Sequence, residues 1–369
     1  MSASDNSSPP APRIRGESII PEVEVADAKG VESEAKVFKS AKTVLVSPAM
    51  AEANNGNWHT AHRWTQFLSG HCDIALLPKW PKPVQALSNP AERAPQLMIA
   101  LHARRSAASI HAWAAAWPHK PLVVVLTGTD LYRDIHTDAD AQRSLALATH
   151  LVVLQDAGLA ALPLAWRSKT TVICQSAPTL KPAVKSQRRF RALMVGHLRD
   201  EKDPLTFMRA AAQTRTATIS FDQIGSELDA DIASAARSTA QQIKNYRWLG
   251  GLPRAVTRQH IKRAHVLVNC SKMEGGAHVI IEAVQSATPV LASHIDGNVG
   301  MLGADYGGYF ALGNDAQLAA LVQHCAVNSD FLMLLQGQCA QRAWLFDADL
   351  EKHNVINLVR SALSALQDS

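Results

Sequence analysis

Residues 265–293 read HVLVNCSKMEGGAHVIIEAVQSATPVLAS, and this stretch decides the fold class. A continuous apolar run (265–270) precedes a glycine turn, a helix-like run (277–287) and a second apolar run (288–293). Continuous apolar runs with β-branched residues are typical of strands that a parallel sheet buries on both faces. A strand, a helix and a second strand in this order form a crossover unit. The stretch therefore predicts an α/β fold with a parallel sheet.

The same alternation extends along most of the chain. Further strand-like runs lie at 42–50, 73–77, 96–101, 121–127, 150–155, 171–175, 190–196 and 217–225. Helix-like segments separate them, and a stretch at 177–189 with prolines and lysines and no apolar core interrupts the alternation. The sequence thus predicts two consecutive Rossmann-like domains facing each other. Ligands of such domains bind in a cleft at the carboxyl ends of the sheets.

Four parts follow from this pattern. Residues 1–39 are rich in Ser, Pro, Ala and charge and predict a disordered tail. Residues 40–180 predict the N-terminal Rossmann-like domain, and residues 181–345 predict the C-terminal one. The last helical region is longer than the second sheet needs, so residues 346–369 predict a helix that crosses back to the N-terminal domain.

Composition restricts the possible partners. The 369 residues carry a net charge of +5 without a dense Lys/Arg block, which favours a small anionic ligand over nucleic acid. Five cysteines without C-x-x-C spacing indicate free thiols in a reducing cytoplasm. No apolar run reaches the ~20 residues of a membrane span. The first residues lack the apolar core of a signal peptide.

The loop GHLRDEKDP (196–204) follows a predicted strand. Gly196 allows a tight turn, and Arg199 and Lys202 precede a helix that opens near 203–204. Cations at a helix start favour a phosphate group. The alternative is a charged turn that only faces solvent.

The loop in the opening stretch carries a second set of polar groups. Gly275 and Gly276 let the backbone approach a ligand, and the helix that starts near Ala277 adds its positive end. Glu274 and Glu282 stand eight residues apart and can accept hydrogen bonds from hydroxyls. Hydroxyls at each end with negative charge between them describe a nucleotide diphosphate sugar. The alternative for the acids is an ordinary helix start.

These motifs resemble a known family. EGGAHVIIEA (274–283) is similar to the signature of two glutamates separated by seven residues in family-4-like glycosyltransferases of GT-B architecture, and VGHLRDEKDP (195–204) is similar to their phosphate loop. The family pattern has Arg directly after the glycine, where this chain has His197. Arg199 or Lys202 could carry the charge instead, so the diphosphate contact is one of three residues: His197, Arg199 or Lys202.

The resemblance narrows further over roughly residues 42–345. Together with SPAMAEANNGNWHTAHRW (47–64), LHARRSA (101–107) and TGTDLYRDI (127–135), these motifs resemble the selenosugar synthases of selenoneine biosynthesis. That resemblance implies transfer of N-acetylglucosamine from UDP-N-acetylglucosamine to selenophosphate, with release of UDP. The N-terminal domain would then bind the acceptor and the C-terminal domain the UDP-sugar.

Three loops of the first half suit a phosphate-like acceptor. Arginines and hydroxyls follow two strands, and a polar asparagine loop follows another; a neutral glycan would instead call for aromatic platforms and carboxylates. The alternative for ARRS (103–106) is a solvated helix start. The predicted acceptor-binding residues are Asn54, Asn55, Gly56, Asn57, His102, Arg104, Arg105, Thr127, Thr129, Asp130 and Arg133.

The residues predicted to bind the donor and to take part in catalysis lie in the second half of the chain, except for His102. The predicted donor-binding residues are Gly196, His197, Arg199, Lys202, Gly225, Arg247, Trp248, Leu249, Glu274, Gly275, Gly276, Ala277, His278 and Glu282. The predicted catalytic residues are His102, Arg199, Lys202 and Glu274. An anionic selenium nucleophile needs no dedicated general base. Two alternatives are an ordinary GT-B enzyme with another phosphorylated small acceptor, and a sugar-nucleotide-binding module without turnover.

We expect no metal and no cofactor. The histidines show no zinc-ligand spacing. The triplet DAD occurs at 138–140, 229–231 and 347–349, each time in an alanine-rich, helix-like segment. We therefore interpret these acids as helix caps rather than as Mg²⁺ ligands.

Overall fold

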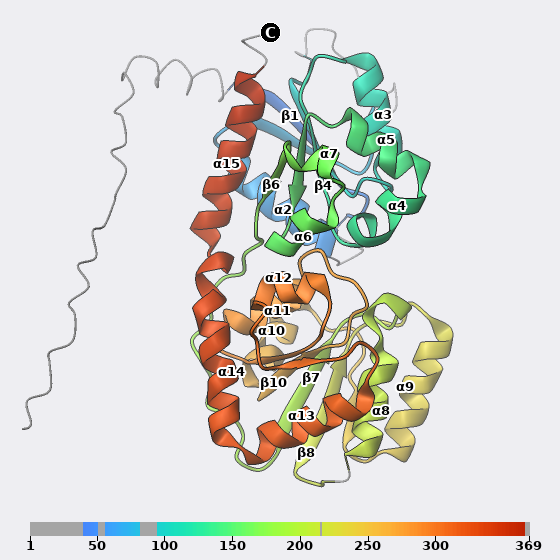
Figure 1. Ribbon diagram of the computed structural model, residues 1–369, viewed down its shortest axis with the longest axis vertical. Coiled ribbons are helices and arrows are strands. Elements are labelled where there is room, and N and C mark those ends of the chain that lie inside the picture. Colours follow the sequence, from blue (N-terminus) through green and yellow to red (C-terminus); the bar gives the residue numbers. More distant parts are fainter. Residues whose placement is uncertain (1–39, 51–55, 82–93, 215, 366–369) are drawn as a thin grey trace, which may run out of the picture. The chain divides into compact units, whose positions relative to one another are not determined.

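The computed structural model describes residues 40–50, 56–81, 94–214 and 216–365. The predicted tail at 1–39 and the predicted acceptor residues Asn54 and Asn55 lie outside the described residues. Two parallel six-stranded sheets lie within the unit Phe38–Ser369 (Figure 1). The predicted fold class is confirmed.

The first sheet has the strand order β2-β1-β3-β4-β5-β6. Its strands are β1 (Lys42–Val46), β2 (Asp73–Leu77), β3 (Leu97–Leu101), β4 (Leu122–Val125), β5 (His150–Val153) and β6 (Thr170–Val172). The helical segments along it are α2 (Gly56–Leu68), α3 (Ala107–Ala116), η3 (Asp130–Asp134), α4 (Ile135–Thr137), α5 (Ala139–Leu147), α6 (Asp156–Ala161) and α7 (Leu164–Arg167).

Both faces of this sheet are buried, which explains its continuous apolar strands. Leu45 on one face packs in a cluster with Trp64 of α2, whereas Val44 on the other face packs in a cluster with Trp113 of α3. Helix α3 therefore packs on the sheet through Trp113.

The second sheet has the order β12-β11-β10-β7-β8-β9. Its strands are β7 (Phe190–Val195), β8 (Ile219–Ile224), β9 (Tyr246–Trp248), β10 (Val266–Asn269), β11 (Val290–Ser293) and β12 (Tyr309–Phe310). Its helices are η4 (Asp200–Lys202), α8 (Pro204–Gln213), α9 (Ala230–Gln242), α10 (Arg254–Arg263), α11 (His278–Val284), α12 (Asp296–Leu302), α13 (Asp315–Val327), α14 (Ser329–Arg342) and η5 (Ala343–Phe346). The short strands β9 and β12 were not predicted, because neither contains a long apolar run.

Each sheet has a topological switch point, where successive connections leave in opposite directions. In the first sheet it lies between β1 and β3, and in the second between β7 and β10. Ligands of open α/β sheets bind outside the strand ends at such points. The loops after these four strands are therefore the positions for a site.

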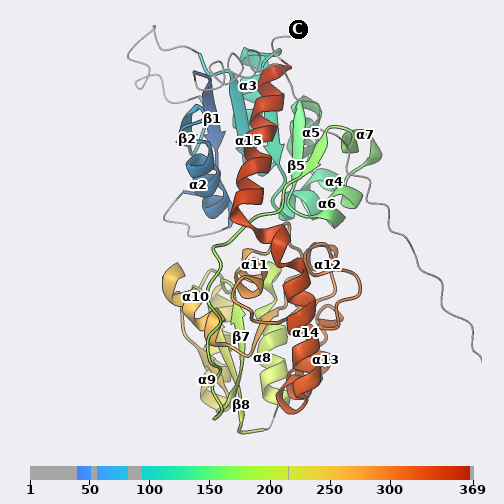
Figure 2. The same cartoon turned by 90° about the vertical axis from the view of Figure 1, so that its left-hand side faces the viewer.

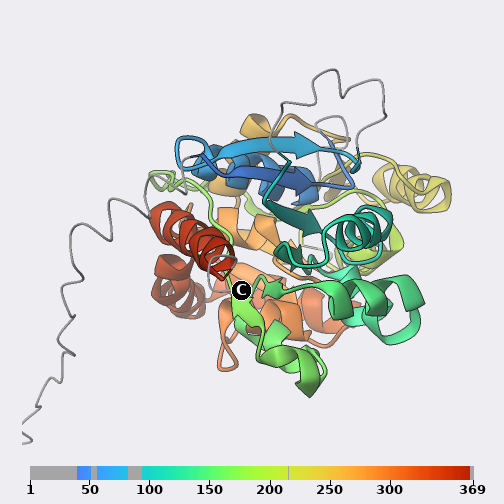
Figure 3. The same ribbon diagram turned by 90° about the horizontal axis from the view of Figure 1, so that it is seen from above.

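The last helix, α15 (Ala348–Ser364), crosses back as predicted. Val355 and Val359 are fully buried in the cluster that contains Leu45 and Trp64 of the first domain. Figures 1 and 2 show α15 alongside the first domain, and Figure 3 shows the red helix beside the blue strands. The chain thus begins and ends its described part on the same domain.

The three DAD triplets are helix caps, as expected. The side chains of Asp138, Asp229 and Asp347 accept backbone N–H groups at the starts of α5, α9 and α15. Among the described residues, no group of three or more His, Cys, Asp or Glu side chains is arranged to hold a metal ion.

Candidate active site

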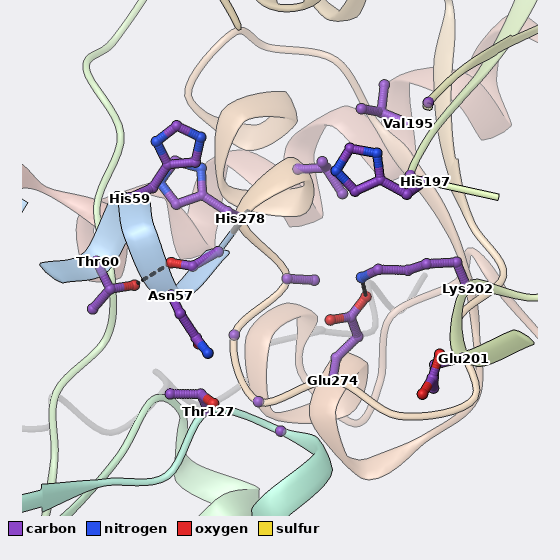
Figure 4. Close-up of a pocket in the computed structure, with 18 of the residues that line it drawn as sticks. Asn57, His59, Thr60, Thr127, Val195, His197, Glu201, Lys202, Glu274 and His278 are labelled. Atoms are coloured by element: carbon purple, nitrogen blue, oxygen red, sulfur yellow. Dashed lines mark hydrogen bonds and ion pairs between the residues drawn. The ribbon is translucent and has the colours of Figure 1, made fainter. Parts of the chain in front are cut away.

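A cavity of about 560 Å³ lies where the loops of the two switch points meet. Figure 4 shows Asn57, Thr60 and Thr127 of the first domain on one side, with His197, Lys202 and Glu274 of the second on the other. Most of the predicted site residues line this cavity: Gly56, Asn57, His102, Arg105, Thr127, Thr129, Gly196, His197, Arg199, Lys202, Gly225, Glu274, Gly275, Gly276, Ala277, His278 and Glu282.

The loop after β7 is held tightly against the loop after β8. The backbone of Gly225 passes so close to Gly196 that a Cβ on Gly225 would lie 1.8 Å from the Gly196 oxygen. The 3-10 helix η4 then brings Lys202 into the cavity. His197, beside Gly196, lines the cavity and accepts the Ser226 N–H at Nδ1 over 3.2 Å. The packing of the two loops therefore requires a glycine at 225, whereas a Cβ on Gly196 would only touch the Lys202 side chain, at 3.4 Å.

Lys202 and Glu274 form an ion pair inside the cavity (Figure 4), with 2.5 Å between Nζ and Oε1. The same carboxylate oxygen accepts the hydroxyl of Ser271 at 2.6 Å and the amide of Asn269 at 3.4 Å. Burial alone would raise the pKa of Glu274, but the Lys202 ammonium and these hydrogen bonds hold the pKa below its usual value. The site therefore contains an ionised, buried carboxylate beside a cation.

The glycine turn after β10 contacts the first domain. A Cβ on Gly275 would lie 2.4 Å from the carbonyl carbon of Thr127, and a Cβ on Gly276 would lie 3.0 Å from Oε1 of Gln175. Both glycines line the cavity, as a predicted ligand contact requires, and both also lie against the other domain, Gly275 against its backbone and Gly276 against side chains. The N–H of Ala277 points to the sulfur of Met301 at 3.2 Å, a weak acceptor.

Glu282 lies on α11, which ends at Val284 rather than at the predicted Ala287. The residue is 4% exposed, and its carboxylate accepts a hydrogen bond from Nε of Arg254 at 3.1 Å. Burial would raise the pKa of Glu282, but His278 and Arg254 hold the pKa below its usual value. Glu282 thus lines the cavity as a second buried carboxylate.

Asp130 organises the first-domain wall rather than contacting a ligand. Its buried carboxylate accepts the N–H groups of Ala103 (2.9 Å), Thr127 (2.8 Å) and Gly128 (3.0 Å). These groups belong to the loops after β3 and β4. The predicted acceptor residue Asp130 therefore holds two site loops together.

His102 is held between these loops in an uncommon conformation with φ of 71°. Its Nδ1 accepts the N–H of Arg105 at 3.3 Å, and its Nε2 lies 3.0 Å from the Thr129 hydroxyl. Because Nδ1 accepts, Nε2 carries the proton and donates it to Thr129. Burial lowers the pKa of His102, so its ring is neutral near pH 7. Both ring nitrogens of His102 already have hydrogen-bond partners, so a role in positioning the loops fits His102 better than a role as a general base.

Five other predicted residues lie outside the cavity for identifiable reasons. Arg104 and Arg133 both bind the carboxylate of Asp134, at 2.7 and 3.0 Å. Arg247 is paired with Asp222 at 2.8 Å on neighbouring strands. Trp248 donates its indole N–H to the Gly225 oxygen, and Leu249 continues the β9 pairing through its own N–H.

Comparison with known proteins fits this geometry. Residues 178–326 match the family described as glycosyl transferases group 1. Anabaena HepE in complex with UDP and glucose superposes with a TM-score of 0.67 at 16% identity, over 87% of this chain and 100% of that chain. Sucrose-phosphate synthase of Thermosynechococcus elongatus has a TM-score of 0.70 at 14% identity, over 88% and 100%. The pneumococcal O-GlcNAc transferase GtfA, in complex with UDP and GlcNAc, has a TM-score of 0.57 at 17% identity, over 72% and 57%.

Residues 178–326 are therefore a group 1 glycosyltransferase domain, and the chain as a whole has the GT-B fold. Within the part of the chain that the structure describes, no single helix is long and apolar enough to span a membrane, although the bent pair Asp315–Val327 and Ser329–Ser364 meets that test together.

Two cations at or next to the cavity were not predicted from the sequence. Arg254, the first residue of α10, lines the cavity and binds Glu282. Arg63 of α2 donates to Nε2 of the cavity residue His278 at 3.2 Å. Arg254 follows the loop after β9, a strand that was not recognised. Arg63 lies in a helix interior, where sequence carries no sign of a contact 215 residues away.

Proposed function

We propose that this glycosyltransferase is a selenosugar synthase. It transfers N-acetylglucosamine from UDP-N-acetylglucosamine to selenophosphate and releases UDP. The observation that carries the proposal is the position of Arg105. Its exposed guanidinium lines the same cavity as Lys202 and has no salt bridge among the described residues. The cavity thus offers cations on the second-domain wall and a further cation, Arg105, on the first-domain wall.

The second-domain wall suits the UDP-sugar. Lys202, with Arg199 at its side, would meet the negative charge that develops on the leaving diphosphate. Glu274 and Glu282 are held ionised and would accept hydrogen bonds from sugar and ribose hydroxyls. UDP and glucose bound to HepE, and UDP and GlcNAc bound to GtfA, support this assignment by analogy of fold.

The first-domain wall suits a small anion. Arg105 would hold the phosphate-type oxygens of selenophosphate, with Asn57 and Thr129 as hydrogen-bonding neighbours. The selenium electron pair forms a bond to the anomeric carbon, and the bond from that carbon to the diphosphate oxygen breaks with its pair leaving on UDP. The nucleophile is already anionic, so no proton has to be removed. The neutral, fully engaged His102 agrees with this chemistry.

Two further features belong to the proposal. The reaction needs no metal, because Lys202 and Arg199 supply the positive charge that a metal would otherwise bring to the diphosphate. The enzyme works in the cytoplasm, where its free thiols remain reduced.

The test is incubation of the protein with UDP-N-acetylglucosamine and selenophosphate, followed by mass spectrometry. We expect UDP and a sugar that carries selenium at a ratio of one to one. Parallel reactions contain a phosphorylated small acceptor without selenium, or no acceptor. UDP release with the selenium-free acceptor alone would overturn the selenium assignment in favour of an ordinary GT-B glycosyltransferase. If the protein binds UDP-N-acetylglucosamine but UDP is formed in none of these reactions, the protein is a sugar-nucleotide-binding module without turnover.

A further inference from the structure

A chain of four polar side chains crosses from the last helix to the donor wall of the cavity. It begins at Glu351 on α15, whose side chain is fully buried. Arg63 of α2 binds this carboxylate through two nitrogens, Nε at 2.7 Å and Nη2 at 2.9 Å. Paired contacts of this kind fix the plane of the guanidinium as well as its charge.

Other donors hold Glu351 in place. The indole N–H of Trp64 binds Oε1 at 2.8 Å, and Ser176 binds Oε2 through its N–H at 2.7 Å and its hydroxyl at 2.6 Å. The carboxylate therefore accepts five hydrogen bonds from three residues on two separate segments, α2 and the stretch after β6. Its position, and with it the position of Arg63, is set by the packing of α15 against the first domain.

The remaining nitrogen of Arg63 reaches the second domain. Nη1 lies 3.2 Å from Nε2 of His278. Arginine can only donate, so Nε2 must accept and carries no proton. The proton of the neutral ring is then on Nδ1, which faces Oε1 of Glu282 at 3.4 Å. Burial lowers the pKa of His278, which agrees with a neutral ring.

The contacts of Glu282 share one feature. His278 (3.4 Å), Arg254 (3.1 Å) and Arg258 (3.8 Å) all approach the same oxygen, Oε1. The hydrogen bond from Arg254 also ends on Oε1, which leaves Oε2 available to the cavity that Glu282 lines. A carboxylate held by one oxygen presents the other in a fixed direction.

We propose that Arg63 is a positioning residue for the donor, acting through His278 to orient Glu282 toward the hydroxyls of the nucleotide ribose. This inference rests on the proposed UDP-sugar site. It makes the affinity for the donor depend on a first-domain helix and on Glu351 of the last helix. Arg63 itself touches neither substrate.

The test uses the substitution Arg63→Lys and two ligands, UDP and its 2′,3′-dideoxy analogue. Lysine keeps a positive charge beside Glu351, but a single Nζ cannot bind Glu351 and His278 at once. Calorimetry should show UDP binding weakened by about tenfold, the usual worth of one or two hydrogen bonds. The dideoxy analogue should bind both proteins alike to within about twofold, because it lacks the hydroxyls that Glu282 would contact.

A matched control is Arg360→Lys, at an exposed position on α15. It should bind both ligands as the unmodified protein does. A second variant, His278→Phe, leaves the pair of Arg63 and Glu351 intact and should show the same loss for UDP only. Adding Arg63→Lys to His278→Phe should cause no further loss.

Three results would overturn the proposal. Equal weakening of both ligands by Arg63→Lys would mean a general structural effect. Unchanged UDP affinity in either variant would mean that the chain does not reach the donor. Independent, additive losses in the double variant would mean that Arg63 does not act through His278. An unmodified protein that binds no UDP would instead overturn the proposed function itself.

Discussion

The backbone of Gly128 in the first domain lies directly against the backbone of Gly275 in the second. A Cβ on Gly128 would lie 2.8 Å from the Gly275 nitrogen, and a Cβ on Gly275 would lie 2.7 Å from the Gly128 nitrogen. Real Cβ atoms essentially never come so close to another atom. The two site loops therefore meet in this arrangement only because neither residue has a side chain.

Gly275→Ala should separate these two loops. Overpacking costs about 1–3 kcal/mol, which here opposes the contact between domains rather than either core. We expect turnover of the UDP-sugar to fall by about tenfold or more, with the thermal unfolding midpoint nearly unchanged. Gly337→Ala is the control, since a Cβ there meets nothing within 4 Å and the residue lies in α14. Unchanged kinetics for Gly275→Ala would show that the contact is not needed for activity.

Lys202→Met should affect both stability and donor binding. It leaves the Glu274 carboxylate buried without its cation, which costs about 3–5 kcal/mol of unfolding free energy. UDP affinity should fall by about 10- to 100-fold through the lost charged contact. The double change Lys202→Met with Glu274→Gln should recover most of the stability but not the UDP affinity. Urea unfolding and calorimetry measure the two effects, and parallel recovery of both would argue against a diphosphate contact at Lys202.

Arg105→Gln and Arg104→Gln should behave differently although the residues are adjacent. Arg105 lines the cavity, so its loss should raise the KM for the anionic acceptor by about tenfold and leave the KM for the donor unchanged. Arg104 is bound to Asp134 at 2.7 Å, so its loss should lower stability by about 1 kcal/mol or less and leave both KM values unchanged. Steady-state kinetics with each substrate varied in turn provide the measurement. A raised acceptor KM in Arg104→Gln and unchanged KM values in Arg105→Gln would mean that Arg104, not Arg105, contacts the acceptor.

His59 should make stability fall in mild acid. Burial, with Arg254 nearby, lowers the pKa of His59 from 6.5 to about 4. Between pH 4 and 6.5 the unfolded chain binds a proton that the folded protein does not, so the free energy of unfolding rises with pH in that range and is flat above it. The slope from one such group is at most about 1.4 kcal/mol per pH unit and is smaller here because the ring is partly solvated. His59→Gln should reduce the slope in urea titrations between pH 4.5 and 7.5, and an identical slope would contradict this assignment.

A strand that was predicted from the sequence, β3, differs from one that was not, β9, in how far its residues are buried. Runs such as Leu97–Leu101 are buried along their whole length, and burial on both faces leaves a pattern that is visible in sequence. Strand β9 has only three residues with an exposed arginine in its centre, so it left no such pattern. The Asp caps of α5, α9 and α15 were predictable because an N-cap acts on N–H groups two or three residues away.

Within the site too, the sequence indicated features that depend on neighbouring residues but not contacts between distant segments. The sequence indicated Lys202 and Glu274 through their loops, but not that their side chains are 2.5 Å apart across 72 residues. It could not distinguish Arg104 from Arg105, because the partner Asp134 lies 30 residues away, in η3. It gave no sign that the glycines at 275 and 276, besides lining the cavity, also lie against the first domain.

The sequence by itself determined the parallel sheets, the loops at their carboxyl ends and the chemical groups on those loops, since each depends on residues near one another in the chain. The tertiary structure alone decided which of those groups share a cavity, which are neutralised by partners such as Asp134, and how Glu351 reaches Arg63 and His278. These contacts form between segments far apart in sequence, and whether a charge is free or paired depends on the atoms that folding brings beside it.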